Sequence, residues 1–318
     1  MTSEAVGGSP LQVPTSGAEI FERGYRSYEG ERTGIAGSMR TVLVASMQRA
    51  LGLRRKFRFK VVPIIAVLLA YVPALIFLGI AWFFGSEFFE EFGLQADYAG
   101  YYGQIGFSIA IFAAFATPEL LCSDRRTGML GLYLAGPLTR PRYLLAKGAA
   151  IVLLMMLVTL VPLLFMLAGY SAMGLGPDGA GAIIKLLARI GASGLLVAIF
   201  ITLVSMAVST FTDRTGFAAA GVFMVMIGGG ILTTVVVAEA DANPMVQLLA
   251  PGNLLQDVVY RIFNFQPDTS QLGPGVERRD VLPVEDLSAI GSLGIFAAVC
   301  AVLVVIVVVG YRRLEVTK

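Results

Sequence analysis

Few residues of this chain could make or break bonds. It contains no His, which removes the commonest metal ligand and the side chain that titrates most readily near pH 7. Its two cysteines, Cys122 and Cys300, are expected to be buried or reduced thiols, since disulfides are rare at a cytoplasmic face. The sequence has no phosphate-binding G-x-x-x-x-G-K-[ST] loop, Gly-x-Ser-x-Gly elbow, His-Glu-x-x-His or Cys-x-x-Cys pair. We therefore expect no catalytic residue, cofactor or metal on this chain, and no enzyme activity.

Cationic side chains gather in two short stretches. One stretch, from Ser123 to Lys147, reads SDRRTGMLGLYLAGPLTRPRYLLAK and lies between two long apolar runs. The other, from Arg54 to Lys60, reads RRKFRFK and directly precedes the first apolar run. Positive residues beside apolar spans are retained on the cytoplasmic side of a membrane. Both stretches are therefore predicted to face the cytoplasm.

The apolar runs set the fold class. The chain is 56% hydrophobic and only 14% charged, with a mean hydropathy of +0.77, so it lacks the charge to cover a soluble domain. A run of about 20 apolar residues matches the thickness of a bilayer, and period-2 alternation, which a membrane barrel requires, is absent. The sequence predicts an all-α integral membrane protein with six transmembrane helices, at residues 61–84, 101–121, 148–170, 190–211, 216–238 and 287–311.

The distribution of Lys and Arg predicts the orientation. Of the 24 such residues, 19 lie on one side: 10 in residues 1–60, 5 between the second and third spans, 1 between the fourth and fifth, and 3 after the sixth. Both termini are therefore expected in the cytoplasm, including the short tail 312–318. We expect a multi-pass protein of the cell (plasma or inner) membrane.

The N-terminal 60 residues divide into two parts. Residues 1–37 lack an apolar stripe and are predicted to be a disordered cytoplasmic tail. Residues 38–60 are predicted to form an amphipathic interfacial helix and a basic cluster that bind anionic lipid head groups. Nucleic-acid binding is the disfavoured alternative for this cluster, so we expect no nucleic acid as a partner. The charged residues assigned to this segment are Arg40, Arg49, Arg54 and Arg55.

The outer connection, residues 239–286, is more than a plain loop. An apolar segment is broken by Pro251 and Gly252, and Asn253 is predicted to cap a following amphipathic helix. Asp257 and Arg261 are four residues apart and lie off the apolar stripe of that helix. A short helical hairpin is therefore expected here, which could dip into the outer leaflet or close over the mouth of the bundle.

Four residues are candidates for a pathway or gate. Glu119, near the end of the second span, is costly at that depth unless it is paired or hydrated. Gly229, followed by Thr233 and Thr234 in the fifth span, allows either close helix packing or a pathway-lining segment. Elsewhere the middle of the spans is uncharged, which disfavours transport driven by an ion gradient and favours an external energy source.

The residues of the cationic loop resemble the cytoplasmic signature of ABC-2 type permeases. In that family an acid-Arg-acid cluster precedes Gly-Thr and a leucine-rich turn ending in small-Pro-Leu-Ser/Thr-Arg. Here the corresponding stretch runs from Asp124 to Arg140, and Lys147 matches the Gly-Lys region at the third span. Arg126, Met129 and Gly131 depart from the pattern, since they stand where the family has an acid, Thr and Glu. The resemblance covers roughly residues 40–318.

This resemblance implies a membrane-spanning permease subunit of an ABC transporter, most often an exporter. Its partners would be a separate ABC ATPase subunit, a second permease chain in a homodimer or heterodimer, and membrane lipids. The segment 122–147 would hold the coupling helix that sits in a cleft of the ATPase. The residues implied in ATPase coupling are Asp124, Arg125, Arg126, Gly128, Leu130, Leu132, Leu134, Pro137, Leu138, Arg140 and Lys147.

A second interpretation stays open. The chain could be a six-span assembly or signalling protein that uses the same loop to dock a cytosolic partner without transporting anything. Mostly apolar spans with a few Ser and Thr suit lipids, hydrophobic drugs or peptides as substrates, but they suit lipid-facing helices equally well.

Overall fold

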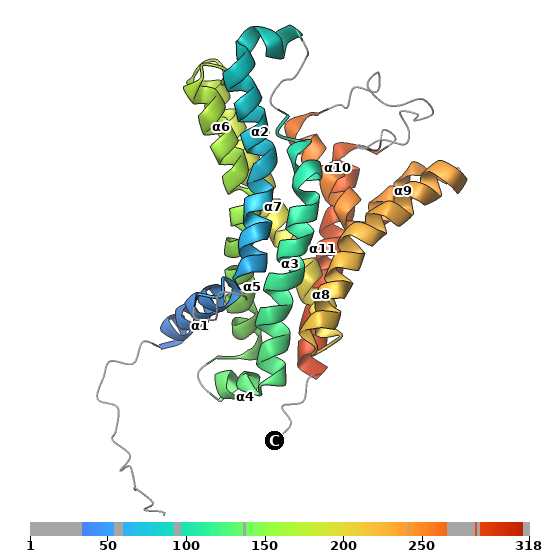
Figure 1. Ribbon diagram of the computed structural model, residues 1–318. Coiled ribbons are helices and arrows are strands. Elements are labelled where there is room, and N and C mark those ends of the chain that lie inside the picture. Colours follow the sequence, from blue (N-terminus) through green and yellow to red (C-terminus); the bar gives the residue numbers. More distant parts are fainter. Residues whose placement is uncertain are drawn as a thin grey trace, which may run out of the picture. The chain divides into compact units, whose positions relative to one another are not determined.

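Nearly all the residues that the computed structural model describes are helical (Figure 1). The structure describes residues 34–53, 60–91, 97–135, 138–240, 242–265, 284 and 287–313. Within these residues there are helices and no strand. The predicted tail therefore lies outside the described residues up to residue 33, as do Arg54, Arg55 and Pro137.

In the described part of the chain, six helical segments are long and apolar enough to cross a membrane, which confirms the predicted all-α protein with six transmembrane helices. Three of them are single helices: α3 (Tyr101–Arg126), α7 (Ala180–Thr210) and α11 (Ala289–Arg313). The first span is the part of α2 (Val61–Glu91) up to Gly85, where the backbone is non-helical (φ 72°, ψ −175°) and the helix is kinked. The third span consists of α5 (Arg140–Thr159) and α6 (Val161–Ala172). The fifth consists of α8 (Thr215–Phe223), the π-helix η2 (Met224–Gly228) and α9 (Gly229–Ala240).

Several helices extend beyond the apolar runs that predicted them. The second span was expected to end at Leu121 but continues as helix to Arg126, and the third begins at Arg140, eight residues before Gly148. Basic residues in the last turn of a helix and a proline in the first turn are both favourable. Hydropathy detects the apolar part of a helix but not such polar ends, so much of the expected loop is helical.

The helix before the first span, α1 (Gly34–Ala50), begins four residues earlier than expected. Its buried residues are Val42, Ser46 and Ala50, which recur every four positions and so share one face. This face packs against α5 and α3 (Figure 1). Residues 34–37, predicted as part of the tail, are therefore the first turn of this helix.

The helix at the centre of the packing is α3. It contacts α2, α5, α7 and α8, and 17 of its 26 residues are buried. In contrast, α9 buries only Val237, and α11 buries only three residues. The helices with few buried residues present apolar side chains outward, as expected where lipid or another membrane protein is the neighbour.

The third span is interrupted where it meets α7. The helix is distorted at Leu160 (φ −100°, ψ −49°), and Pro162, which has no N–H to donate, stands in the first turn of α6. Thr159 donates a hydrogen bond from Oγ1 to the carbonyl of Gly194 on α7, at 3.1 Å. A Cβ atom at Gly194 would lie 2.9 Å from the Cβ of Leu160 and 3.1 Å from its Cα. The absence of a side chain at Gly194 therefore permits this approach.

The outer connection contains the predicted helical hairpin, formed by the 3₁₀ helix η3 (Pro244–Leu249) and α10 (Pro251–Phe263). The predicted cap was wrong, because α10 begins at Pro251 and Asn253 lies inside its first turn. The Asn253 side chain instead donates to Thr233 Oγ1 on α9, at 3.1 Å. Residues 266–283 of this connection lie outside the described residues.

Asp257, expected on the polar side of α10, is fully buried. Its carboxylate accepts hydrogen bonds from Arg261, from the backbone N–H of Val284 and from the hydroxyl of Ser292 on α11. Because α10 contacts α7, α9 and α11, its polar side also faces protein. Asp257 thereby attaches the hairpin to the start of the last span.

The close contact at Gly194 gives a direct test of the packing. We expect Gly194→Ala to lower the free energy of unfolding by about 1–3 kcal/mol, because the new methyl group meets Leu160 backbone. Gly191→Ala, on the same helix, meets nothing within 4 Å and should be neutral or stabilising by up to about 1 kcal/mol. Denaturant unfolding in detergent micelles measures both; equal effects would contradict the proposed contact.

Candidate functional site

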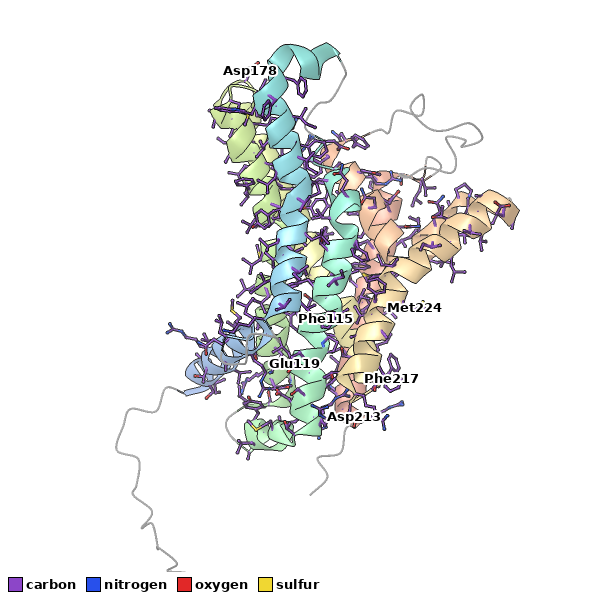
Figure 2. All side chains as sticks on the ribbon, viewed as in Figure 1. Phe115, Glu119, Asp178, Asp213, Phe217 and Met224 are labelled. Atoms are coloured by element: carbon purple, nitrogen blue, oxygen red, sulfur yellow. The ribbon has the colours of Figure 1, made fainter. Side chains whose placement is uncertain are left out.

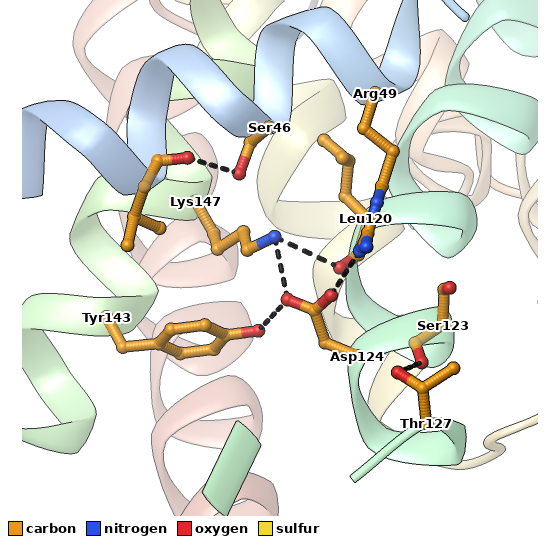
Figure 3. A network of polar contacts seen from close by, with 9 residues as sticks. Ser46, Arg49, Leu120, Ser123, Asp124, Thr127, Tyr143 and Lys147 are labelled. Carbon is orange, nitrogen blue, oxygen red and sulfur yellow. Dashed lines mark hydrogen bonds and ion pairs between the residues drawn. The ribbon is translucent and has the colours of Figure 1, made fainter. Parts of the chain in front are cut away.

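A buried ionic network lies where α1, α3 and α5 meet, at the end of the bundle opposite α10 (Figures 1 and 3). Asp124 on α3 is fully buried and stands at its centre. Its Oδ1 accepts from Arg49 Nη1 of α1 at 2.5 Å, and its Oδ2 lies 2.7 Å from Lys147 Nζ of α5. Tyr143 on α5 donates its hydroxyl to Oδ2 at 2.9 Å. One carboxylate therefore joins three helices.

Sequence spacing explains how these side chains converge. Tyr143 and Lys147 are four residues apart, so they lie on the same face of α5. Lys147 also donates from Nζ to the carbonyl of Leu120, one turn before Asp124 on α3, at 3.4 Å. Arg49 is in the last turn of α1, where a cation is favourable.

Burial makes the partners of Asp124 necessary. The side chain of Lys147 is 2% exposed and that of Asp124 is 0% exposed, whereas Arg49 is 30% exposed. Removing a carboxylate or ammonium from water is expensive unless an opposite charge and hydrogen bonds replace the lost solvation. Asp124 and Lys147 therefore require each other, and Arg49 adds a second cation at the partly solvated edge.

A short helix in the cationic loop, α4 (Met129–Leu134), is attached to this network through Tyr133. The Tyr133 ring lies 5.7 Å from the Tyr143 ring, and its centroid lies 5.9 Å from Lys147 Nζ. Burial and then the negative charge of Asp124 raise the pKa of the Tyr133 phenol, so the ring stays neutral beside the ammonium group. An aromatic face attracts a cation at such distances. One side of α4 is thus held by the network.

Arg125, the residue after Asp124, ties α3 to the end of α7. Its guanidinium donates to the carbonyls of Ser209, Thr210 and Thr212, at 2.6 Å for Ser209 and 3.2 Å for Thr210. The last carbonyls of a helix lack intrahelical partners, and a cation there also interacts favourably with the helix dipole. Arg125 therefore fixes the corner between α7 and α8 to the end of α3.

The structure separates the predicted coupling residues into two groups. Asp124, Lys147 and Leu138 are buried, and Arg125 and Arg140 are engaged with backbone carbonyls; Arg140 donates to that of Arg312 at 2.9 Å. The remaining described residues of the set are at least partly accessible: Arg126, Gly128 and Leu132 are exposed, and Leu130 and Leu134 are half-buried. The exposed members, Arg126, Gly128 and Leu132, offer the most surface to a partner.

The interfacial and pathway candidates occupy separate places. Arg49 belongs to the ionic network, whereas Arg40 is exposed on α1. Glu119 is half-buried on α3, five residues before Asp124 (Figure 2). Gly229, Thr233 and Thr234 lie on α9, which packs on the outer hairpin. The structure therefore does not gather the four gate candidates into one site.

Sequence reasoning missed the contribution of Tyr133 and Tyr143. The spacing of Tyr143 and Lys147 was a usable signal, because it places an aromatic hydroxyl and an ammonium on one helix face. Tyr133 gave no comparable signal, since its contacts depend on how α4 folds back on α5. Among the described residues no group of three or more His, Cys, Asp or Glu could hold a metal ion.

A comparison with known proteins identifies the family. The family model described as ABC-2 family transporter protein matches residues 19–317. The chain belongs to this family. No curated protein matches it significantly. Membership of the ABC-2 family, together with the six spans, makes this chain a multi-pass membrane protein and a membrane subunit of a transporter.

The buried pair predicts a large effect of a small substitution. Asp124→Asn should lower the free energy of unfolding by about 3–5 kcal/mol, because Lys147 is left as an uncompensated buried charge. The same change at the exposed Asp213 should alter it by less than about 0.5 kcal/mol. Denaturant unfolding in micelles measures both variants. The double variant Asp124→Asn/Lys147→Met should regain part of the loss, and a double variant less stable than Asp124→Asn would argue against the pair.

Proposed function

We propose that this chain is the permease subunit of an ABC exporter, driven by ATP hydrolysis on a separate ATPase chain that docks on α4. The observation that carries this proposal is the position of α4, an exposed short helix mounted on the buried Asp124 network. The family supports an ABC ATPase as the partner. Export is proposed from the resemblance of the loop to that of exporting permeases.

The outward side of α4 suits a docking element. Leu132 is 66% exposed, although it is a large apolar side chain between Gly131 and Tyr133. Gly128 precedes the helix with φ 70°, a left-handed conformation that sets the turn from α3 into α4. An exposed apolar residue at the tip of a helix fits a hydrophobic cleft on a partner.

We infer the orientation from the distribution of Lys and Arg along the sequence. Ten of the 24 Lys and Arg residues precede residue 61, and five more lie between residues 122 and 147. By the positive-inside rule this end faces the cytoplasm, where ATP is available. The outer hairpin then faces the opposite side of the membrane.

Motion of α4 would reach the spans through two rigid connections. Tyr133 contacts Tyr143 and Lys147, and Asp124 then links α5 to α1 and α3. Arg125 continues the connection to the carbonyls before α8. Because buried ionic contacts resist separation, a displacement of α4 is expected to move α3 and the α7–α8 corner together.

A second permease chain completes the proposed transporter. Apolar side chains of α8, η2 and α9 face outward, among them Phe217, Met224, Ile231 and Leu232. An exposed apolar stripe of this kind is compatible with lipid and with a second permease chain, either a copy of this one or a related chain. Membrane lipids cover whatever surface remains.

Docking on α4 is tested by one substitution with a matched control. Leu132→Asp should abolish co-purification of the ATPase and reduce the ATP hydrolysis that co-purifies with the permease at least tenfold, because a buried carboxylate at an apolar contact costs roughly 2 kcal/mol or more. Leu249→Asp makes the same change at a 78% exposed leucine on η3, at the opposite end of the bundle, and should leave the ATPase bound. Size-exclusion profiles and ATPase assays of the purified complexes provide the measurement.

The alternative function gives a different result in the same experiment. If the chain is an assembly or signalling protein, a cytosolic partner binds α4 but the purified complex hydrolyses no ATP and moves no substrate. If Leu132→Asp and Leu249→Asp behave alike, α4 is not the docking element.

A further inference from the structure

An arginine-lined groove opens at the corner between α7 and α8, beside the end of α3. Its volume is about 630 Å³, and its lining residues are Arg126, Arg214, Thr215, Gly216, Phe217 and Ala220. Figure 2 shows Asp213 and Phe217 at this end of α8, close to the end of α3. No residue of α4 and none of the bonded residues of the Asp124 network lines the groove, but Arg126 was among the predicted coupling residues.

The lining carries two positive charges and no acidic residue. Arg126 and Arg214 are both exposed, and neither is paired with a carboxylate among the described residues. The guanidinium carbon of Arg214 lies 5.8 Å from the centroid of the Phe217 ring. Guanidinium groups bind phosphate oxygens in a bidentate manner, so two of them in one groove favour a phosphate group.

Hydrogen bonds of Arg125 hold together the two backbone segments that carry Arg126 and Arg214. Arg125 binds the carbonyls of Ser209 and Thr210, which fixes the chain just before Arg214. Its neighbour Arg126 projects from the same turn of α3 but is exposed. The first turn of α8 also lines the groove, and Arg214 makes no side-chain cap there, so its early N–H groups can add to the attraction.

The location indicates which phosphate compound would reach the groove. It lies between the ends of two membrane-spanning helices, α3 and α8, which pack against each other. The Phe217 side chain is 66% exposed beside the arginines, so an apolar surface adjoins the positive charge. A phospholipid presents this combination, a phosphate with acyl chains below it. Basic pockets between transmembrane helices at the inner leaflet are a recognised kind of head-group site.

We propose that this groove binds the head group of an anionic phospholipid of the inner leaflet, with Arg126 and Arg214 on the phosphate and Phe217 against the glycerol and upper acyl chains. The proposal rests on the orientation proposed above but not on ATPase coupling. A lipid bound here contacts the end of α3 and the start of α8 at once.

Lipid binding by the purified full-length permease tests the proposal without any ATPase present. Native mass spectrometry in detergent would measure the affinity for phosphatidylglycerol and, as the neutral reference, phosphatidylcholine. The wild type should prefer phosphatidylglycerol. Each single variant, Arg126→Gln or Arg214→Gln, should bind it about fivefold more weakly, and the double variant about thirtyfold more weakly.

The matched control removes two other exposed arginines from the same end of the bundle. Arg142→Gln/Arg313→Gln makes the same change in net charge outside the groove and should leave the affinity within twofold of the wild type. All variants should keep the wild-type unfolding curve, because the substituted side chains are exposed. Equal losses in both double variants, or no loss in either, would overturn the groove as a lipid site.

Two further measurements distinguish a lipid from a small phosphate ester or a partner protein as the occupant of the groove. Glycerol 3-phosphate at millimolar concentration should not displace phosphatidylglycerol; complete displacement would assign the groove to small phosphate esters and overturn the lipid proposal. If Arg126→Gln/Arg214→Gln keeps its phosphatidylglycerol affinity but loses the ATPase, the groove contacts the partner protein instead. A loss of lipid affinity with the ATPase still bound supports the proposal.

Discussion

The burial of one carboxylate determines how α1, α3 and α5 pack together at the end of the bundle that contains Asp124. Asp124 is fully buried, so its charge must be matched from inside the protein, and the matching groups come from two other helices. Any arrangement that separated α1 or α5 from α3 would expose or orphan one of these charges. This requirement explains why α1, a helix too short and too polar to span, nevertheless packs firmly on the spans. Apolar contacts alone would hold it less specifically, because apolar surfaces slide more easily than a bonded ion pair.

Two adjacent arginines at the end of α3 have different surroundings. Arg125 is turned inward and occupies the carbonyls at the end of α7, whereas Arg126 is exposed beside Arg214. Between the second and third spans, the described residues are mostly the last turns of α3, the short α4 and the first turns of α5, which contact one another through the Asp124 network and Tyr133. A partner that pushes on α4 acts on a stiff structure.

The architecture and part of the candidate site could be predicted from the sequence. Long apolar runs predicted six spans because nothing but a helix satisfies the backbone in lipid, and the structure confirms them. The helix ends were missed because Arg125, Arg126 and Arg140 look like loop residues by hydropathy, although Arg125 and Arg126 are favourable in the last turn of α3 and Pro141 suits the first turn of α5. Asp124 and Lys147 were singled out by resemblance, but their mutual burial depends on the packing of α3 on α5 and leaves no trace in a linear pattern. Asp257 illustrates the same limit: its helix is amphipathic, yet its polar side is covered by α11 and the chain near Val284.

The π-helical turn at Met224–Gly228 divides the fifth span between two neighbours. A π turn adds one residue to the helical repeat, so every side chain after it is rotated by about 100° relative to a continuous α-helix. The face that α8 turns toward α3 is therefore not continued by α9, which packs instead on η3 and α10. Gly230 and Thr233 then meet Asn253 of α10 from this rotated face. One extra residue thus changes the packing partner of the fifth span partway along its length. Its first half, α8, packs on α3, and its second half, α9, packs on the outer hairpin formed by η3 and α10.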